Sequence, residues 1–290
     1  MKKIGFIGLG NMGAKMVANL LKANYKVVGF DVNKKSIDDL MHFGLKKASS
    51  LDDISGDLDI IITMLPNGKI VEEVYNSIIS NLEPNTLLVD CSTINVSEAS
   101  RLHEKCNKHN LLSLDAPVSG GVVGAENGTL TFMVGGSDEA YNLMLPLFNV
   151  MGNKSVLCGS HSSGQAAKAC NNMLLAITMI GVGEAFNLGS NLGLDANKLF
   201  QILSTSSASC WSINNYCPIE NVGPKSPADN NYQPGFSANL MLKDLTIALE
   251  AIENTKTSAP FGRKAKENFE AMINNEKGDL DFSAIINFNK

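Results

Sequence analysis

The sequence predicts an α/β protein in which a doubly wound parallel sheet is followed by an all-helical domain, with one long helix joining them. The first half alternates short β-branched runs with amphipathic stretches. Runs such as residues 59–65 and 86–89 are apolar on both faces, as strands in a helix-covered parallel sheet are. After Gly164, strand signals nearly disappear and helical spacing takes over.

Strands are predicted at residues 3–8, 26–31, 58–65, 86–90 and 111–115, with helices at 14–23, 34–43 and 70–79. Residues 165–192 contain no proline and have recurrent apolar positions, which predicts a helix about 42 Å long. A further helix is predicted at 195–204, and two more at 239–253 and 259–272 follow an irregular loop at 206–234. The domain boundary is therefore expected near Gly164, giving domains 1–164 and 165–290.

The composition is that of a globular protein of about two domains, since the chain has 290 residues, of which 44% are apolar and 18% charged. Its 24 basic and 29 acidic side chains give a net charge of −5, and no basic patch is evident. We expect a small-molecule partner, and neither nucleic acid nor an anionic membrane.

No apolar stretch approaches the 18 residues of a membrane span, the longest being residues 173–182. The first residues run straight into a strand without a secretory signal, so we expect a cytoplasmic protein. The six cysteines form no C-x-x-C pattern, which predicts reduced and mostly buried thiols, no disulfide framework and no metal site.

A G-x-G-x-x-G motif leaves the first predicted strand and opens the first helix. Its glycines permit a tight turn, close approach of the backbone to a pyrophosphate and close helix-to-strand contact, while the helix N-terminus offers N–H groups to the anion. The motif predicts a dinucleotide-binding loop made of Gly8, Leu9, Gly10, Asn11, Met12 and Gly13.

Asp31 ends the second predicted strand, 18 residues beyond Gly13. A carboxylate at this place can bind the adenosine ribose diol and repels a 2′-phosphate, so NAD is favoured over NADP. Lys34 and Lys35 keep NADP open, and the structural alternative for Asp31 is a strand-end cap.

Two further segments carry candidate chemistry. Ser119, Gly120 and Gly121 follow a predicted strand at the carboxyl edge of the sheet, where their N–H groups and hydroxyl can bind a small anion, although as an isolated string they favour a turn. Lys168 and Asn172 share one face of the long helix. A lysine there can act as general acid or base, as nucleophile, or snorkel to water, and spacing alone favours snorkelling.

Lys243 and Asp244 by themselves indicate a solvated charge pair, and the four histidines indicate no proton relay.

Together these segments resemble the β-hydroxyacid dehydrogenase family over essentially the whole chain. The similarity lies in four motifs, at residues 5–13, 115–136, 164–172 and 243–245. Ser162 departs from the pattern, because the family often has glycine at this position.

The resemblance implies a Rossmann-type domain followed by a helical substrate and dimerisation domain like that of 6-phosphogluconate dehydrogenase. It makes Lys168 the catalytic acid/base, with Asn172 positioning the substrate and Ser119, Gly120 and Gly121 holding its carboxylate. The residues implied to line NAD are Leu65, Pro66, Ile70, Thr93 and Lys243. No metal is implied, and a homodimer or homotetramer is expected.

Residues 210–245 are most similar to the branch of this family that oxidises (S)-3-hydroxyisobutyrate to methylmalonate semialdehyde in valine catabolism. Trp211, Tyr232 and Phe236 suggest a pocket wall suited to a methyl branch. The alternatives are a tartronate semialdehyde (2-hydroxy-3-oxopropionate) reductase or another short β-hydroxyacid dehydrogenase, and, from a different class, a non-catalytic dinucleotide-binding scaffold.

Overall fold

The computed structural model describes residues 2–54 and 58–288, and the chain divides into two compact units, Met1–Lys168 and Ala169–Lys290. The division falls at Lys168, four residues beyond the boundary expected near Gly164. The reason is that the first turn of the long helix is bonded to the first unit, because the backbone N–H groups of Ser162 and Gln165 donate to the carboxylate of Asp115.

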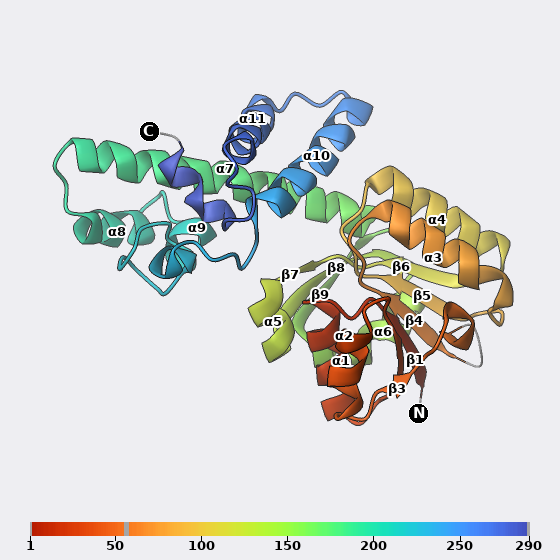
Figure 1. Ribbon diagram of the computed structural model, residues 1–290. Helices are drawn as coiled ribbons and strands as arrows, with labels where there is room; N and C mark the ends of the chain where they lie inside the picture. Colours follow the sequence, from red (N-terminus) through yellow and green to blue (C-terminus); the bar gives the residue numbers. More distant parts are fainter. Residues whose placement is uncertain (1, 55–57, 289–290) are drawn as a thin grey trace. The chain divides into compact units, whose positions relative to one another are not determined.

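The first unit contains one mixed sheet (Figure 1). Its strands are β1 (Lys3–Ile7), β2 (Lys26–Phe30), β3 (Lys46–Lys47), β4 (Ile60–Thr63), β5 (Leu87–Asp90), β6 (Leu112–Asp115), β7 (Val118–Ser119), β8 (Leu130–Gly136) and β9 (Gly152–Gly159). In the described residues they are ordered β3-β2-β1-β4-β5-β6-β8-β7, with β9 pairing with β8. From β1 the chain adds β2 and β3 on one side, and then β4, β5 and β6 on the other. The switch point lies between β1 and β4, and ligands bind at this point in open doubly wound sheets.

The five strands expected from the sequence are present and pair in parallel, as predicted. The sequence did not reveal four others. β3 and β7 are two residues long, and β8 runs antiparallel to β6 and β7, so this end of the sheet is not wholly parallel. β9 pairs in parallel with β8 and is largely exposed, so it lacks the apolar pattern that marks a buried strand.

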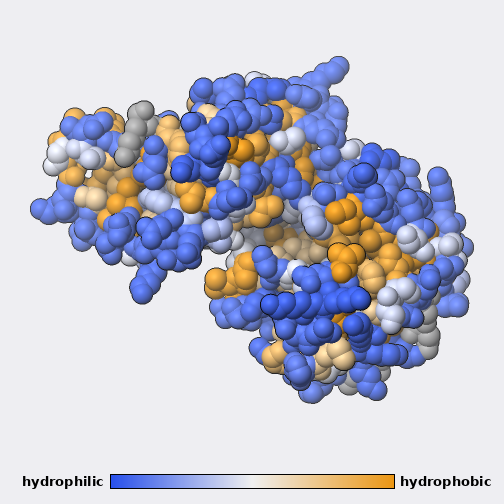
Figure 2. All heavy atoms as spheres, in the orientation of Figure 1, coloured by the Kyte–Doolittle hydropathy of each residue, from blue (hydrophilic) through white to orange (hydrophobic). Residues whose placement is uncertain are grey.

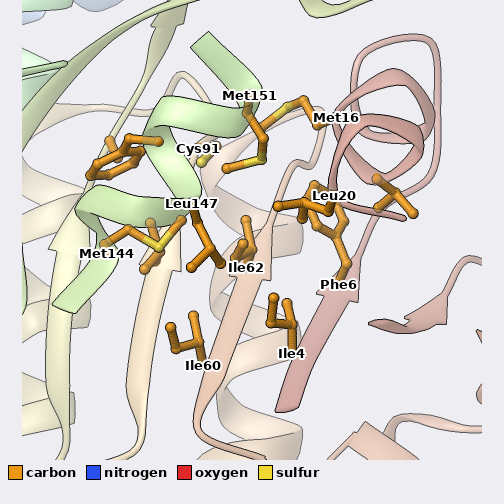
Figure 3. Packing of buried hydrophobic residues seen from close by; sticks show 14 of the residues in the cluster. Ile4, Phe6, Met16, Leu20, Ile60, Ile62, Cys91, Met144, Leu147 and Met151 are labelled. Atoms are coloured by element: carbon orange, nitrogen blue, oxygen red, sulfur yellow. The ribbon is translucent and has the colours of Figure 1, made fainter. Parts of the chain in front are cut away.

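Helices cover both faces of this sheet (Figure 1). One face is covered by α1 (Gly13–Lys22), α2 (Lys34–Met41), α5 (Gly121–Asn127) and α6 (Asp138–Met151), and the other by α3 (Gly68–Ile78) and α4 (Val96–Lys108). Side chains alternate along β4, with Ile60 and Ile62 in the first layer and Ile61 in the second. Figure 3 shows the first layer, in which Met16 of α1 and Leu147 of α6 lie over these strands.

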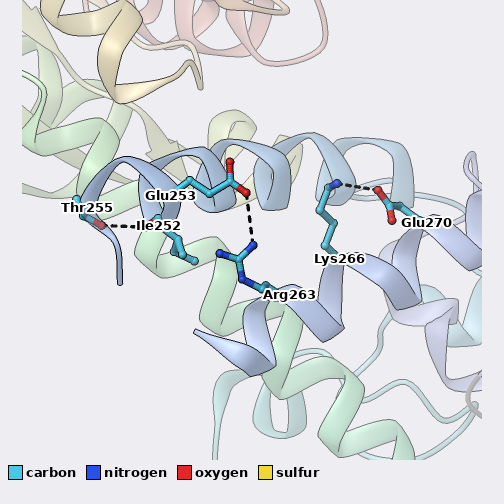
Figure 4. A network of polar contacts seen from close by, with 6 residues as sticks. All are labelled: Ile252, Glu253, Thr255, Arg263, Lys266 and Glu270. Carbon is cyan, nitrogen blue, oxygen red and sulfur yellow. Dashed lines mark hydrogen bonds and ion pairs between the residues drawn. The ribbon is translucent and has the colours of Figure 1, made fainter. Parts of the chain in front are cut away.

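The second unit is helical. Its helices are α7 (Ser163–Asn191), which begins in the first unit, α8 (Ala196–Thr205), α9 (Trp211–Asn214), α10 (Ala238–Thr255) and α11 (Pro260–Asn274). Its core joins Met179 of α7, Leu245 of α10 and Phe269 of α11. In Figure 4, α10 and α11 lie side by side and the Arg263 guanidinium reaches the Glu253 carboxylate at 3.4 Å. This ion pair is exposed, so it contributes at most about 1 kcal/mol.

Two sequence expectations are corrected in part. The segment predicted as an irregular loop contains α9 and a short 3-10 turn at Pro227–Asn230. Of the six cysteines, which are all free thiols, only three are buried; Cys158 and Cys170 are exposed and Cys210 is half-buried.

The long helix α7 is present as predicted, but it is more apolar over the length of a membrane span than the sequence analysis expected. Among the described residues it is the one helix whose length and composition would allow it to cross a membrane. A core helix of a soluble protein has the same properties, and α7 buries Ala176, Met179 and Phe186 in the second unit. The described residues contain no cluster of three His, Cys, Asp or Glu side chains that could hold a metal ion.

Candidate cofactor and catalytic site

The three glycines of the loop after β1 differ in their surroundings. Gly8 has a φ of +96°, and a Cβ added to it would lie 2.3 Å from the carbonyl oxygen of Met64. A Cβ on Gly13 would lie 1.9 Å from the Gly8 carbonyl oxygen, whereas a Cβ on Gly10 would meet nothing within 4 Å. Gly8 and Gly13 therefore permit the turn and the packing of α1 on β1, and Gly10 leaves exposed backbone that a pyrophosphate can approach.

The rest of this loop agrees with that division. Leu9 is buried in the core, Met12 is half-buried against it, and Asn11 is exposed beside Gly10. The apolar side chains hold the loop while its outer edge stays open. This arrangement fits a dinucleotide.

Asp31 closes the loop from the neighbouring strand. Its carboxylate accepts a 2.6 Å hydrogen bond from the N–H of Leu9 and a 2.7 Å bond from that of Asn33. Asp31 thus has the structural role considered as its alternative. Each carboxylate oxygen has two lone pairs, so the side chain still has acceptor capacity for a ribose diol.

The segments after β4 and β5 lie beside the glycine loop. The Leu65 N–H donates a 2.8 Å hydrogen bond to the hydroxyl of Ser92, which precedes the half-buried Thr93. Pro66 is exposed, and Ile70 lies in the first turn of α3, where its N–H is capped by the Asn67 side chain at 3.0 Å. The expected cofactor residues of the first unit therefore gather at the carboxyl ends of β1, β2, β4 and β5.

Lys168 is buried and does not snorkel to water. Its side chain is 8% exposed, and its ammonium donates a 2.8 Å hydrogen bond to the carbonyl oxygen of Val118. The next residue is Ser119, followed by Gly120 and Gly121 with φ values of +132° and +62°. The lysine is therefore bonded to the residue directly before the candidate carboxylate loop.

Asp115 fixes the start of α7, which carries this lysine. Its two carboxylate oxygens accept the N–H groups of Ser162 at 2.7 Å and Gln165 at 2.8 Å. Burial raises the pKa of Asp115, and the backbone donors oppose that shift. Cβ atoms on Gly135 and Gly164 would come within 2.4 Å of Asp115 and of the Met133 carbonyl, so the cradle fits only glycine.

In the second unit, Asn172 forms a buried polar pair that the sequence did not indicate. Its side-chain amide donates a short hydrogen bond to the carboxylate of Asp244, and both side chains are at most 5% exposed. The expectation of a solvated Lys243–Asp244 pair is therefore wrong for Asp244, although Lys243 is half-buried. The motif at residues 243–245 was the available signal, but burial of the aspartate depends on the fold.

Trp211 and Phe236 belong to an aromatic cluster of the second unit. Trp211 stacks on Tyr216, and Phe236 packs edge-on against Phe282 at 5.7 Å. Trp211 is 49% exposed, so one face can contact a ligand. Tyr232 instead donates its hydroxyl to the Pro218 carbonyl and packs in the core of this unit.

A second group of titratable side chains lies behind the strand ends. His103 and His161 stack on each other and line a cavity of about 20 Å³ together with Asp90, Asp115 and Tyr75. No sequence pattern indicates this cluster, because its members come from separate segments of the chain. It lies in the first unit, and none of its residues belongs to the predicted catalytic set.

The glycine loop at the sheet's switch point, with an acidic residue closing it, defines a dinucleotide-binding domain. A family model described as the NAD binding domain of 6-phosphogluconate dehydrogenase matches residues 3–159, and one described as NAD-binding of NADP-dependent 3-hydroxyisobutyrate dehydrogenase matches residues 162–289. The chain belongs to the β-hydroxyacid dehydrogenase family, as its motifs suggested.

Curated relatives match almost the whole chain. A probable 3-hydroxyisobutyrate dehydrogenase of Mycobacterium tuberculosis is 42% identical, covering 99% of this chain and 97% of the relative. An NAD-dependent L-serine dehydrogenase of Pseudomonas aeruginosa is also 42% identical, covering 98% and 97%. The solved structure of M. tuberculosis 3-hydroxyisobutyrate dehydrogenase with L-serine has a TM-score of 0.94 and covers 99% of this chain and 98% of that one.

These matches show an enzyme of the β-hydroxyacid dehydrogenase class with a small-molecule substrate and NAD as its cofactor. They leave the particular substrate open, because both dehydrogenases are equally similar to this chain.

Proposed function

We propose that this enzyme oxidises (S)-3-hydroxyisobutyrate to methylmalonate semialdehyde with NAD, and that Lys168 is its acid/base. The observation that carries the proposal is the buried Lys168 ammonium, which is bonded to the residue directly before Ser119. The names of relatives at 41–42% identity support the choice of substrate. The reaction would then belong to valine catabolism.

NAD, which residues 8–13 and Asp31 would hold, would supply the acceptor for the hydride of the carbinol carbon. The Lys168 amine takes the hydroxyl proton, and in the reverse direction its ammonium returns a proton to the same oxygen. The Val118 carbonyl orients the Lys168 side chain, since a carbonyl can only accept from it. A buried lysine is separated from bulk water, which reduces proton exchange during the hydride step.

The substrate carboxylate is proposed to bind at Ser119, Gly120 and Gly121. The positive φ values of the two glycines turn the backbone sharply before α5, and both glycines are exposed. Such a turn presents N–H groups to an anion. Asn172 lies one helical turn beyond Lys168 on α7 and is proposed to position the substrate, with Asp244 holding its amide.

L-Serine is the second candidate substrate. It is also a β-hydroxy acid, with an ammonium where 3-hydroxyisobutyrate has a methyl group. An L-serine dehydrogenase is among the relatives, and L-serine is present in the M. tuberculosis structure. Aromatic side chains such as Trp211 and Phe236 favour a methyl group over an ammonium, because an ammonium loses hydration against aromatic carbon unless it is paired.

Steady-state rates decide between the candidates. The panel is (S)-3-hydroxyisobutyrate, 3-hydroxypropionate, L-serine, L-threonine and glycerate, each with NAD and NADP. We expect the highest kcat/KM for (S)-3-hydroxyisobutyrate with NAD, by at least about tenfold over L-serine, since one methyl group in an apolar pocket is worth about 1–3 kcal/mol. A higher kcat/KM for L-serine would overturn the proposed substrate.

We also propose that residues 165–290 mediate self-association. No residue of α8 is buried, and Leu188, Leu192, Leu194 and Ile202 are each more than half exposed. Figure 2 shows apolar side chains at the surface around the end of α7 and α8. Light scattering is expected to give at least twice the chain mass of 31.0 kDa, and Ile202→Glu to lower it. A monomer at micromolar concentration contradicts this.

A cytoplasmic location stays a prediction, since the relatives include mitochondrial proteins.

A further inference from the structure

Gln165 holds the loop around Thr93 from both sides. Its side chain is 1% exposed, its amide nitrogen donates to the Ser92 carbonyl at 2.7 Å, and its amide oxygen accepts from the Ile94 N–H at 3.2 Å. The orientation of the amide is unambiguous, because a carbonyl can only accept and an N–H can only donate. The two bonds fix the backbone on each side of Thr93.

The same residue is anchored at the start of α7. The Gln165 N–H donates to Asp115 at 2.8 Å, and Lys168 follows three positions later in the same helix. Lys168 is in turn bonded to Val118. The backbone of Gln165 therefore moves together with the helix turn that carries the lysine.

The Thr93 loop has a second attachment on its other side. The Ser92 hydroxyl accepts the N–H of Leu65, the residue expected beside the cofactor after β4. The loop between β5 and α4 thus connects the cofactor-lining segment to the first turn of α7, and Gln165 is the side chain that completes this connection.

We propose that Gln165 is a positioning residue for the dehydrogenase reaction, which sets the place of Thr93 relative to Lys168. The inference rests on the proposed roles of Thr93 at the cofactor and of Lys168 as acid/base. Gln165 touches neither substrate nor cofactor in this scheme. It acts through the backbone of residues 92–94.

The isosteric variant Gln165→Glu tests this connection most sharply. An ionised glutamate can still accept from the Ile94 N–H, but it cannot donate to the Ser92 carbonyl and repels it. A misplacement of about 1 Å at a reacting centre can cost about 100-fold. We therefore expect kcat to fall about 10- to 100-fold at pH 8, with the Kd for NAD changed less than about threefold.

Protonation provides the readout that separates positioning from folding. When the carboxylate introduced by Gln165→Glu is protonated, it regains a donor toward the Ser92 carbonyl. The activity of this variant relative to wild type should therefore rise as the pH is lowered. Gln165→Leu has no proton to gain, and its activity relative to wild type should stay flat across the same pH range.

A control variant removes a partly buried side-chain hydrogen bond elsewhere in the first unit. Ser113→Ala loses the bond between Ser113 and His103, at a position 7% exposed and outside the proposed site. We expect it to lower the Tm while kcat stays within about twofold of wild type. Thr93→Ala combined with Gln165→Leu should cost less than the product of the two single effects, because both act through one loop.

The proposal is overturned if Gln165→Glu and Gln165→Leu keep the kcat of the wild type. It is also overturned if both variants lower the Tm as Ser113→Ala does and the kcat of Gln165→Glu does not recover at low pH. It is also overturned if the effects of Thr93→Ala and Gln165→Leu simply multiply. Lys168→Ala separates the proposed function from the role of Gln165. Retained turnover of Lys168→Ala refutes the proposed function. An inactive Lys168→Ala together with a fully active Gln165→Leu refutes only the role of Gln165.

Discussion

The Lys168 ammonium donates a 2.8 Å hydrogen bond to the carbonyl oxygen of Val118, joining the second turn of α7 to β7. Because Val118 is followed by Ser119 and two glycines with positive φ, this bond links the proposed acid/base to a candidate anion-binding turn. Both groups belong to the first unit, so their relation is set by one core.

Replacing Lys168 by alanine should abolish most turnover. A positioned general acid/base contributes about 10²- to 10⁴-fold, so we expect kcat to fall by that factor while NAD still binds, as measured by fluorescence titration. The control is Lys264→Ala, which removes an exposed lysine of α11 whose side chain is 68% exposed. Near-normal turnover of Lys168→Ala would refute the assignment.

Changing the end of β2 should change the cofactor preference. Asp31→Ala removes the carboxylate that repels a 2′-phosphate, and Val32→Arg adds a cation at a side chain that is 90% exposed. We expect the ratio of kcat/KM for NADP to that for NAD to rise at least about tenfold. Asp31 also holds the glycine loop, so both rates should fall and only their ratio is diagnostic. Val32→Arg alone is the control, and an unchanged ratio in the double variant contradicts the interpretation of Asp31.

Much of the first unit could be predicted from sequence because its central strands are buried on both faces. The run at Ile60–Thr63 is buried throughout, and such a run has few alternatives to a central strand. β8 is also largely buried but has a weaker strand signal, because its segment ends in two glycines, which are unfavourable in strands. Most residues of β9 are exposed, so its segment lacks the apolar run that marks a buried strand.

The candidate site was predictable only where the chemistry is local. The glycine loop and Asp31 are recognised from spacing, because strand, turn and helix are consecutive in the chain. Gln165 and Asp244 were missed as site residues, because their partners lie 71 to 73 and 72 residues away. Likewise, spacing favoured a snorkelling Lys168, since nothing near it in sequence shows that Val118 will cover it.

Replacing Ser162 by glycine should stabilise the protein. Ser162 has a φ of +70°, a left-handed conformation that costs a non-glycine residue about 1–2 kcal/mol. Its buried hydroxyl has no hydrogen-bond partner among the described residues. Glycine removes both costs but loses about 0.5–1 kcal/mol of unfolded-state entropy. We expect a gain of about 1 kcal/mol, seen as a Tm increase of about 2–4 °C in calorimetry.

The control for this prediction is Ser160→Gly, two residues earlier, where φ is not positive. There the added flexibility has no compensating relief, so the Tm should fall. If both substitutions change the Tm in the same direction, strain at Ser162 is not the cause.

The cluster behind the strand ends, in which Asp90 is buried and His103 half-buried, should make the free energy of unfolding depend on pH in two opposing ways. Burial raises the pKa of Asp90 to about 6, while Thr63 and Ser92 hydrogen bonds oppose the shift. Burial and the neighbouring His161 lower the pKa of His103 to about 4. Asp115 and Tyr75, which line the same cavity, also have raised pKa values.

The signs follow from proton linkage. A raised Asp90 pKa contributes stability that is present below pH 3.8 and is lost as the pH rises through about 6. A lowered His103 pKa contributes stability that is present above pH 6.5 and is lost as the pH falls through about 4. The two contributions therefore oppose each other between about pH 4 and pH 6.5 and flatten the profile of the wild type.

Asp90→Asn should remove the first contribution and leave the second. We consider the free energy of unfolding of the variant minus that of the wild type. This difference should be about 2–3 kcal/mol larger at pH 7.5 than at pH 4, since one pKa unit corresponds to about 1.4 kcal/mol. Comparing the two proteins at each pH cancels any constant cost of the amide. For His103→Gln, the free energy of unfolding minus that of the wild type should instead be larger at pH 4 than at pH 7.5, because this variant lacks the contribution that the wild type loses as the pH falls. Urea unfolding at pH 4, 5.5 and 7.5 measures both, and a difference between Asp90→Asn and wild type that stays constant over this range would show that Asp90 ionises normally in the folded protein.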